Sequence, residues 1–472
     1  MKVDRERPSP ASARETAAPS TSTPTTPGQP AAPAARGWSV RGAAPVAAPA
    51  SDGFAAVAPR RGTVGSGVAP AAPSRFRDPA FSARLDADTL SKAHAGNQVT
   101  MLFDGVNSFA ERDRMIDGAR KSVCLQTFIL SSDDTGMALA HKLVAKAKEG
   151  VQVRVIYDGV GSKDSDKKIF EVLRQGGVEV LEHTFLKDVG EVNHSWHEKH
   201  LIVDGAASVE GGMNIANEYA LGGSGKLVFS RGTKGTEAWR DADVKVVGPA
   251  VNDASRSFLA NWKSLGGKVS AADEAALLPT IPAQANGTTV RVISSKPTDS
   301  ARADTTHKLY LHAIEHAQKS ITIENAYFLP PDDLRKALVG AAQRGVQVKV
   351  LTNSRQSNDL TVVADASRYF YDELEKAGVK IYEKQGGTLH AKTACFDGEL
   401  SIVGSVNLNG RSANLDAEDA VVIDGPQVGQ QLESRFTSGL SQAREITLGE
   451  LGSEAFTTNL RQWALHSFAW TF

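Results

Sequence analysis

The sequence predicts an α/β protein built from two similar units that share one active-site cleft, preceded by a disordered leader. Two observations lead to this prediction. From about Asp86, strand-like and helix-like segments alternate nearly to the end of the 472-residue chain, as they do in layered α/β folds. The same segments also occur twice in the same order, about 195 residues apart.

The leader is predicted from composition. Residues 1–78 consist mainly of Ala, Pro, Ser, Thr and Gly, with few side chains that could bury a core, so ordering them would cost entropy without return. The remainder divides into a first domain at 79–270 and a second at 285–472. The join is expected near residues 266–288, where loop-forming residues are frequent.

The internal repeat is carried by four pairs of strand-like segments. They are Ser122–Leu130 with Ser320–Leu329, Glu149–Gly161 with Arg344–Ser354, Gln175–His183 with Lys376–Lys384, and His197–Gly205 with His390–Gly398. Amphipathic runs at Met137–Gly150 and Asp332–Gly345 separate the strands, and each ends in Gly, as a helix does. Two α/β/α sandwiches related by pseudo-twofold symmetry can each present one motif to a shared cleft.

Charge argues against nucleic acid as a partner. The formal net charge is −1, and residues 1–78 carry ten Lys and Arg against five Asp and Glu, so the rest of the chain is weakly acidic. Affinity for nucleic acid comes mainly from Lys and Arg that displace counterions from phosphates. No run approaches the roughly 20 apolar residues needed to cross a bilayer, and the first residues do not resemble a signal peptide. We expect a cytoplasmic or peripheral membrane protein, with secretion by a route other than Sec left open.

The motif that points to chemistry is His-x-Lys-x4-Asp, which occurs once in each repeat. Its members are His197, Lys199 and Asp204 in the first half and His390, Lys392 and Asp397 in the second. On a strand, residues two apart lie on one face, so each His and Lys can reach the same phosphate. Cleavage of a phosphodiester needs a nucleophile, a proton donor for the leaving oxygen and cations for the nonbridging oxygens. Two His and two Lys supply all of these.

Further residues follow each motif. The Asp of each motif is expected to support an imidazole or the geometry at the end of the strand. The steps Gly211–Asn214 and Gly404–Asn407 each end in Asn, and their amides are predicted to donate to phosphate oxygens, which brings Gly212 and Ser405 into the predicted substrate site.

These paired motifs and their followers resemble the phospholipase D superfamily over about residues 95–445. The second half, with ENAYFLPP, GVKIYEKQGGTLHAKT and GSVNLNGRSANLDAE, is especially similar to bacterial cardiolipin synthases, and HEKHLIVDG, GGMNIANEY and WRDADVKVVGPAV agree in the first half. The resemblance implies a covalent phosphohistidine, with His197 as the nucleophile and His390 as the general acid and base. The near symmetry of the two halves leaves the reverse assignment open.

The resemblance also implies binding residues. Lys199, Lys392, Asn214 and Asn407 would hold the phosphoryl group. Glu418 is predicted to contact substrate. Glu418 is one of four carboxylates at positions where the family has acidic groups near the cleft; the others are Asp241, Asp243 and Asp416. The alternative for these four residues is that they cap helices or are exposed to solvent. Typical cardiolipin synthases carry amino-terminal membrane spans, whereas this sequence has an Ala/Pro-rich leader, and this departure bears on the exact substrate.

Several other patterns favour ordinary structural interpretations. The run His194–His200 invites a metal site, but its His-Glu-x-His spacing is one residue short of the zincin motif, so neither metal nor cofactor is expected. The glycines of 222–227 fail the phosphate-loop pattern.

Trp196 and Trp239 could line the cleft or pack at a domain surface. Aromatic residues at the carboxyl end could dock at a membrane interface or pack on the second domain; they are Trp463, Phe468, Trp470 and Phe472.

The sequence therefore predicts a phospholipase D-type phosphodiesterase or phosphatidyltransferase resembling cardiolipin synthase, which acts on glycerophospholipids such as phosphatidylglycerol or phosphatidylethanolamine. We expect peripheral membrane contact, a monomer and no nucleic-acid partner. A metal-independent endonuclease and a secreted lipid-degrading effector are the alternatives. Transfer and hydrolysis are not distinguished, because pocket shape decides whether an alcohol or water reaches the phosphohistidine.

Overall fold

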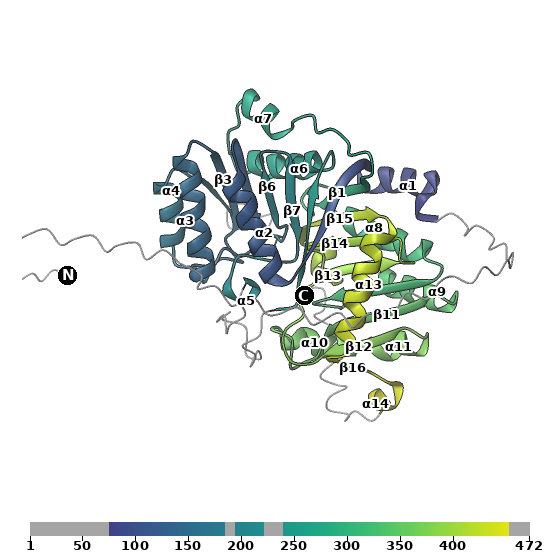
Figure 1. Ribbon diagram of the computed structural model, residues 1–472. Helices are drawn as coiled ribbons and strands as arrows, with labels where there is room; N and C mark the ends of the chain where they lie inside the picture. The colour runs from purple at the N-terminus through teal and green to yellow at the C-terminus, as the bar shows by residue number, and fades with distance from the viewer. Residues whose placement is uncertain (1–74, 185–193, 221–238, 453–472) are drawn as a thin grey trace, which may run out of the picture. The chain divides into compact units, whose positions relative to one another are not determined.

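Each half of the chain forms a mixed sheet, and the two sheets share one strand order (Figure 1). The computed structural model describes residues 75–184, 194–220 and 239–452. In spatial order, the first sheet contains β1 (His94–Phe103), β8 (Ala242–Val247), β7 (Ala207–Gly211), β6 (His200–Val203), β2 (Ser122–Thr127), β3 (Gln152–Asp158) and β4 (Glu179–His183). The second contains β9 (Thr288–Ser295), β15 (Asp416–Asp424), β14 (Leu400–Gly404), β13 (Lys392–Phe396), β10 (Ser320–Asn325), β11 (Gln347–Asn353), β12 (Lys380–Lys384) and β16 (Ala443–Glu445).

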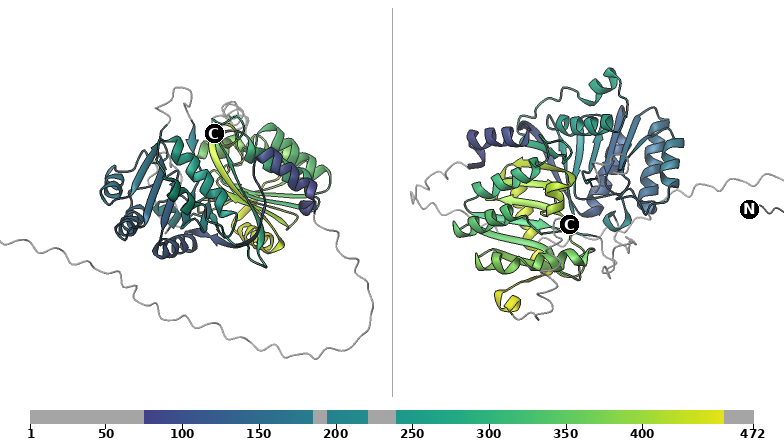
Figure 2. Two further views of the ribbon diagram at one scale, coloured as in Figure 1. Left: turned by 90° about the horizontal axis from the view of Figure 1, so that it is seen from above. Right: turned by 180° about the vertical axis from the view of Figure 1, so that it is seen from behind.

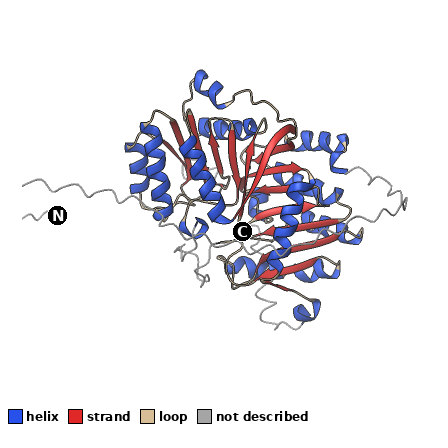
Figure 3. Ribbon diagram, in the orientation of Figure 1, coloured by secondary structure: helices blue, strands red, loops and turns tan. Residues whose placement is uncertain are grey.

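The two sheets are continuous through their first strands. β1 pairs antiparallel with β9, with His94 opposite Val290 and Asn97 opposite Thr288. The strands drawn in red in Figure 3 therefore run through both halves, with helices on either side. This arrangement confirms the predicted fold class of two related α/β/α units, and it adds that the units share a single sheet.

Helices cover both faces of each half (Figure 2). In the first half, α2 (Asp104–Gly118), α3 (Asp134–Lys148) and α4 (Lys168–Gln175) pack over one apolar cluster, and α6 (Val251–Ser264) packs on another. In the second, α8 (Thr305–His316), α9 (Asp332–Gln343) and α11 (Tyr371–Lys376) cover one face, and α13 (Pro426–Leu440) joins α6 in a central cluster that draws on both halves. Shorter helices are α5 (Asn217–Ala220), α7 (Ala271–Leu277), α10 (Thr361–Arg368), α12 (Gly410–Asn414) and α14 (Leu448–Gly452).

The repeated helices form for the reasons that the sequence indicates. Asp133 caps α3 by accepting a hydrogen bond from the Gly136 amide at 3.0 Å. After α3 and α9, Gly150 and Gly345 adopt φ values of 90° and 89°, a left-handed backbone conformation that terminates the helix and that other residues adopt at a cost. The predicted helical runs are confirmed at these positions. The stretch predicted to be rich in loops contains one short helix, α7.

The first described residues pack against the second half of the chain. η1 (Arg75–Arg77), which lies at the end of the predicted leader, and α1 (Pro79–Thr89) bury Phe76, Phe81 and Leu85 in the apolar cluster of α8 and α9. Asp88 of α1 accepts from His312 at 2.7 Å. The predicted first domain thus begins with a helix that contacts the second, and the domain boundaries remain predictions.

Several predicted features fall outside the described residues. They are residues 1–74 of the leader, the Gly-rich segment 222–227 and the aromatic residues from Trp463 onward. Within the described ranges, no helix combines the length and apolar character that crossing a bilayer requires.

Anchoring of α1 is testable through Phe81, which is 3% exposed and lies edge-on to Phe76 with ring centroids 5.3 Å apart. Phe81→Ala should lower the free energy of unfolding by about 3–5 kcal/mol, because it removes buried apolar area and leaves a cavity. Urea denaturation measures the change. Val106→Ala, at a position that is 69% exposed on α2, is the control and should change stability little. Equal effects of the two substitutions would contradict the packing described for α1.

Candidate active site

The backbone of each His-x-Lys motif is hydrogen-bonded to the opposite half of the chain. β5 (Ser195–Trp196) pairs parallel with β15, and the His197 amide donates to the Ala417 carbonyl at 2.8 Å. In the second half, the His390 amide donates to the Arg240 carbonyl at 2.7 Å. The extended segments that carry both histidines are thereby fixed at the contact between the two halves, immediately before β6 and β13.

Each catalytic-type imidazole also receives its carboxylate partner from the opposite half. His197 Nδ1 lies 3.0 and 3.1 Å from the two carboxylate oxygens of Glu418 on β15. His390 Nδ1 lies 2.8 Å from Asp241 Oδ2, immediately before β8. With the proton on Nδ1 donated to the carboxylate, Nε2 of each ring carries the lone pair. Glu418 and Asp241 occupy equivalent positions in the repeat.

The predicted contacts of Gly212 and Ser405 with substrate are replaced by supporting contacts to these carboxylates. Ser405 Oγ donates to Glu418, and its amide donates to the Asp419 carbonyl. A Cβ atom added to Gly212 would lie 2.2 Å from Asp241 Oδ1, so only Gly leaves room for that carboxylate. Both amides donate within the protein, that of Gly212 to Ala242, and are not available to a phosphate.

Burial sets the charge state of the site. Burial and the neighbouring Lys199 and Lys392 hold the pKa values of both His197 and His390 well below the usual range, so both imidazoles are neutral at pH 7. Burial also raises the pKa of Glu418 to about 7. Neutral histidines with a free ring nitrogen suit nucleophilic and general-base chemistry.

The two motif lysines are buried, and each donates to the carbonyl of its own histidine, but their contacts with the imidazoles differ. Lys199 Nζ donates to the His197 carbonyl, and the ammonium lies 5.6 Å from the centre of the Phe128 ring. Lys392 Nζ lies 3.1 Å from both ring nitrogens of His390. Burial lowers the pKa of Lys392 to about 7. The two halves are therefore alike in backbone but not in the surroundings of their imidazoles.

A cavity of about 290 Å³ brings the predicted residues of both halves together. His197, His390, Asn214 and Asn407 all line it. Its other walls are mainly apolar or aromatic with acidic and basic groups among them, and include Phe128, Ile129, Val160, Lys163, Asp164, Tyr219, Tyr327, Asp359, Leu360, Val363, Arg411 and Asp416.

The two asparagines differ in how they are held. Asn214 Oδ1 accepts from the Ile129 amide at 3.0 Å, and its Nδ2 donates to Tyr219 Oη at 2.9 Å. Asn407 Oδ1 is buried without a hydrogen-bond partner among the described residues. A buried unpaired carbonyl oxygen is costly, so a donor from substrate would be favourable at this position.

Sequence and structure comparisons identify the family to which this chain is similar. A family model described as cardiolipin synthase, PLD-like domain, matches residues 113–222 and 310–439. Cardiolipin synthase A of Pseudomonas entomophila (strain L48) is 35% identical over 359 residues, which cover 75% of this chain and 70% of the relative. The chain belongs to the cardiolipin synthase-like phospholipase D family.

Two further comparisons of this phospholipase D-like enzyme are with a second cardiolipin synthase and with a solved structure. Cardiolipin synthase of Alkalihalophilus pseudofirmus (strain ATCC BAA-2126 / JCM 17055 / OF4) is 31% identical over 363 residues, covering 76% of this chain and 69% of that protein. The crystal structure of phosphatidylserine synthase from Haemophilus influenzae Rd KW20 gives a TM-score of 0.64 at 14% identity, covering 83% of this chain and all of that one. The latter supports the fold.

The Asp of each motif in this phospholipase D-like chain lies at the end of a strand. Asp204 accepts from the amides of Arg120, Lys121 and Ser122, and Asp397 accepts from three amides at the equivalent turn, Gln318 to Ser320. Neither lines the cavity. Of the two predicted roles, support of an imidazole or of strand-end geometry, the contacts match the second.

The remaining candidate carboxylates and tryptophans divide between cleft and core. Asp416 lines the cavity and pairs with Arg411 at 3.0 Å, whereas Asp243 pairs with Arg112 at 2.8 Å in the core. Trp196 stacks on a histidine, His183, beneath the motif. Trp239 packs 5.4 Å from His390, measured between ring centroids, so it supports the imidazole without lining the cavity.

Sequence reasoning missed several polar groups on the cavity wall, among them two tyrosines and Asp359. Tyr327 Oη donates to Asp359 at 2.7 and 2.8 Å, and Tyr219 contacts the His390 ring edge-on at 5.1 Å between centroids. The tyrosines stand within ENAYFLPP and GGMNIANEY, which carried the resemblance, so they could have been found there. Asp359 follows a strand end without a pattern that links it to either motif.

Each half supplies a carboxylate to the imidazole of the other half, and the variants Glu418→Gln and Asp241→Asn test this positioning role. Each should lower kcat by about 100-fold with a small change in KM, because the imidazole loses the partner that fixes its tautomer and stabilises its charged form. Steady-state kinetics with a phospholipid substrate measures both parameters. The matched control is Asp243→Asn, an equally buried carboxylate paired with Arg112. Retention of wild-type kcat by Glu418→Gln and Asp241→Asn would contradict the positioning role.

The strand-end role of the motif Asp is tested by Asp397→Ala. This change should lower the free energy of unfolding by roughly 3 kcal/mol, because amides lose a charged acceptor and Ala must adopt φ near 55°. Asp397→Asn tolerates that backbone and should lose less. Thermal unfolding and kcat of the folded protein are measured together. A large loss of kcat at unchanged stability would instead give this Asp a part in catalysis.

Proposed function

We propose that this chain is a phosphatidyltransferase of the phospholipase D type that works through a covalent phosphohistidine on glycerophospholipids. The observation that supports it most is that two neutral imidazoles from different halves line one cavity, each with Nδ1 held by a carboxylate of the other half. Such a pair supplies a nucleophile and a separate proton carrier. The cardiolipin synthase relatives support phosphatidyl transfer.

In the proposed reaction, His390 first takes up a proton from solvent on Nε2, which the bound phosphodiester anion favours. Nε2 of His197 then attacks the phosphorus and displaces the headgroup oxygen, which takes that proton from His390. An acceptor alcohol then gives its proton to His390 and attacks the phosphorus, which breaks the bond to His197 and restores both imidazoles. With a second phosphatidylglycerol as the acceptor the product is cardiolipin. With water the product is phosphatidic acid.

His197 is assigned as the nucleophile because of the different surroundings of the two rings. The ammonium of Lys392 lies 3.1 Å from Nε2 of His390 and competes for the lone pair there. Both lysines donate to the carbonyl of their own histidine, but among the described residues only Lys392 also contacts the ring. Asn214 and Asn407, on the cavity wall, and the two lysines behind the rings are proposed to hold the phosphoryl oxygens.

The cavity wall favours a lipid over a nucleic acid. The wall carries three acidic residues, Asp164, Asp359 and Asp416, against two basic residues, Lys163 and Arg411, beside apolar side chains such as that of Phe128. Acidic groups repel a polyanionic backbone, whereas they can accept hydrogen bonds from a glycerol or ethanolamine headgroup. An endonuclease is therefore the second candidate. We also propose peripheral contact with a membrane, since the substrate resides there, and a monomer, since one chain supplies both motifs.

The proposal is tested by incubating the purified chain with phosphatidylglycerol and phosphatidylethanolamine vesicles and resolving the lipid products by mass spectrometry. Cardiolipin, or phosphatidic acid with free headgroup, should form with the wild-type protein. His197→Ala and His390→Ala should each lower the rate at least 1,000-fold, on the order of the loss on removing a catalytic nucleophile or base. The first product indicates transfer and the second hydrolysis.

Plasmid DNA and RNA are incubated with the same preparations as a parallel arm. Absence of lipid products together with nucleic-acid cleavage that both His variants lose would replace the lipid proposal with the nuclease. Lipid products that persist in both variants would place the activity outside this cavity.

A further inference from the structure

A second polar centre lies behind the catalytic strands, on side chains that the proposed reaction does not use. His200 begins β6 directly after Lys199, and Glu210 on β7 stands opposite it in the antiparallel register. Asp419 of β15 comes from the other half of the chain. All three are at most 1% exposed, and one ligand-type atom from each lies within 4.8 Å of the others.

Each of these side chains has an unused atom. Ser208 Oγ donates to Glu210 Oε1 at 2.9 Å, and the Lys199 amide donates to Asp419 Oδ1 at 3.4 Å. Glu210 Oε2, Asp419 Oδ2 and both ring nitrogens of His200 are buried without a hydrogen-bond partner among the described residues. His200 makes ion-pair contacts with Glu210 and Glu198 at 3.7 and 3.9 Å, which are longer than hydrogen bonds. Buried polar atoms without hydrogen bonds cost free energy, so their gathering in one place indicates a ligand.

We propose that His200, Glu210 and Asp419 form a structural site for one divalent transition-metal ion that joins the two halves of the chain. An imidazole and two carboxylates are ligands that suit Zn²⁺ or Mn²⁺, and the two negative charges match a divalent cation. Zn²⁺ bonds of about 2.0–2.2 Å require the three atoms to draw together by side-chain rotation. The bound ion would take part in no step of the lipid reaction, and this proposal does not depend on the proposed function.

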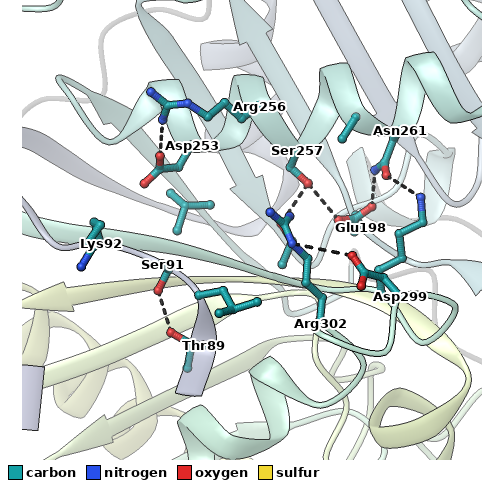
Figure 4. A pocket seen from close by; sticks show the side chains of 15 residues that line it. Thr89, Ser91, Lys92, Glu198, Asp253, Arg256, Ser257, Asn261, Asp299 and Arg302 are labelled. Carbon is teal, nitrogen blue, oxygen red and sulfur yellow. Dashed lines mark hydrogen bonds and ion pairs between the residues drawn. The ribbon is translucent and has the colours of Figure 1, made fainter. Parts of the chain in front are cut away.

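The surroundings of His200 match the outer contacts that metal-bound histidines make. Nδ1 lies 3.7 Å from Glu210 Oε2 and faces the shared centre, while Nε2 lies 3.9 Å from Glu198 Oε1. A carboxylate on the far nitrogen orients a metal-bound imidazole and raises its basicity. Glu198 is itself fixed by Asn261 at 2.7 Å and by Ser257 at 3.3 Å, and Figure 4 shows both side chains turned toward it.

A polar pocket of about 380 Å³ gives access to this outer carboxylate. Glu198 lines the pocket together with Ser257 and Asn261 (Figure 4). Lys296 lines it as well. Because neighbouring side chains of an extended segment point to opposite faces, Glu198 turns away from the cavity that His197 lines. The outer carboxylate therefore faces this pocket, on the side of the segment away from the cavity that holds the catalytic imidazoles.

Comparison of the two halves shows that the fold does not require these ionisable groups. At the positions equivalent to His200, Glu210 and Asp419, the repeat carries Thr393, Val403 and Ala242, in that order, on strands with the same pairing. Glu198 likewise corresponds to Ala391. The cluster therefore has no counterpart at the position related to it by the internal repeat. The run that contains His194 and His197 lacks the zincin spacing, and only His200 of that run belongs to this site.

The experiment measures Zn²⁺ bound to the full chain after removal of metal with a chelator and dialysis against Zn²⁺, using elemental mass spectrometry and the thermal unfolding midpoint. Wild-type protein should hold about one Zn²⁺ per chain and unfold at a higher temperature than the metal-free form. Glu210→Gln and Asp419→Asn should each lower the affinity at least tenfold. Glu198→Gln should lower it by about 10–100-fold through its effect on His200.

Two control variants separate this site from others. Asp243→Asn removes a buried carboxylate elsewhere and should retain Zn²⁺. His390→Ala removes a catalytic imidazole and should also retain it, so loss of Zn²⁺ in this variant would place the metal in the cavity and overturn the proposal. If the ligand variants do not fold, the wild type decides: binding of neither Zn²⁺ nor Mn²⁺ at micromolar concentration overturns the site.

Discussion

The exchange of carboxylates between the two halves is the interaction on which the active site depends. Glu418 holds His197 and Asp241 holds His390, and the backbone of each motif is hydrogen-bonded to the same opposite strand region that supplies the carboxylate. Neither half can orient its own imidazole. Continuity of the sheet through β1 and β9 fixes the two halves against each other, which makes this exchange geometrically possible.

The halves have diverged within this shared frame. Ser405 donates to the longer side chain of Glu418, whereas Gly212 leaves room for the shorter side chain of Asp241. The two carboxylates are therefore held beside their imidazoles by different neighbouring residues. The lysines differ in the same way, because only Lys392 contacts the ring of its own histidine. A duplicated fold can thus give two similar histidines unlike tasks, one as nucleophile and one as proton carrier.

The sequence predicted the repeated strands and the four cavity residues because these features are local. Strand pattern, Gly at helix ends and the His-x-Lys spacing are all read from neighbouring residues. The pairing of His197 with Glu418 joins residues 221 positions apart, and nothing in the sequence specifies that contact. The place of Asp204 was undecided for a similar reason, since a left-handed turn with φ of 54° and its three amide donors become visible only in the fold.

The central claim is that His197 becomes covalently bound to the phosphatidyl group, and trapping that intermediate tests it most directly. Wild-type and His390→Ala protein are mixed briefly with phosphatidylglycerol, denatured at alkaline pH, where phosphohistidine persists, and digested for peptide mass spectrometry. A phosphatidyl adduct is predicted on the peptide that contains His197 in the wild-type protein, and His390→Ala, which lacks the proton donor for the leaving oxygen, should form this adduct more slowly. An adduct on His390, or none on either histidine under turnover conditions, would contradict it.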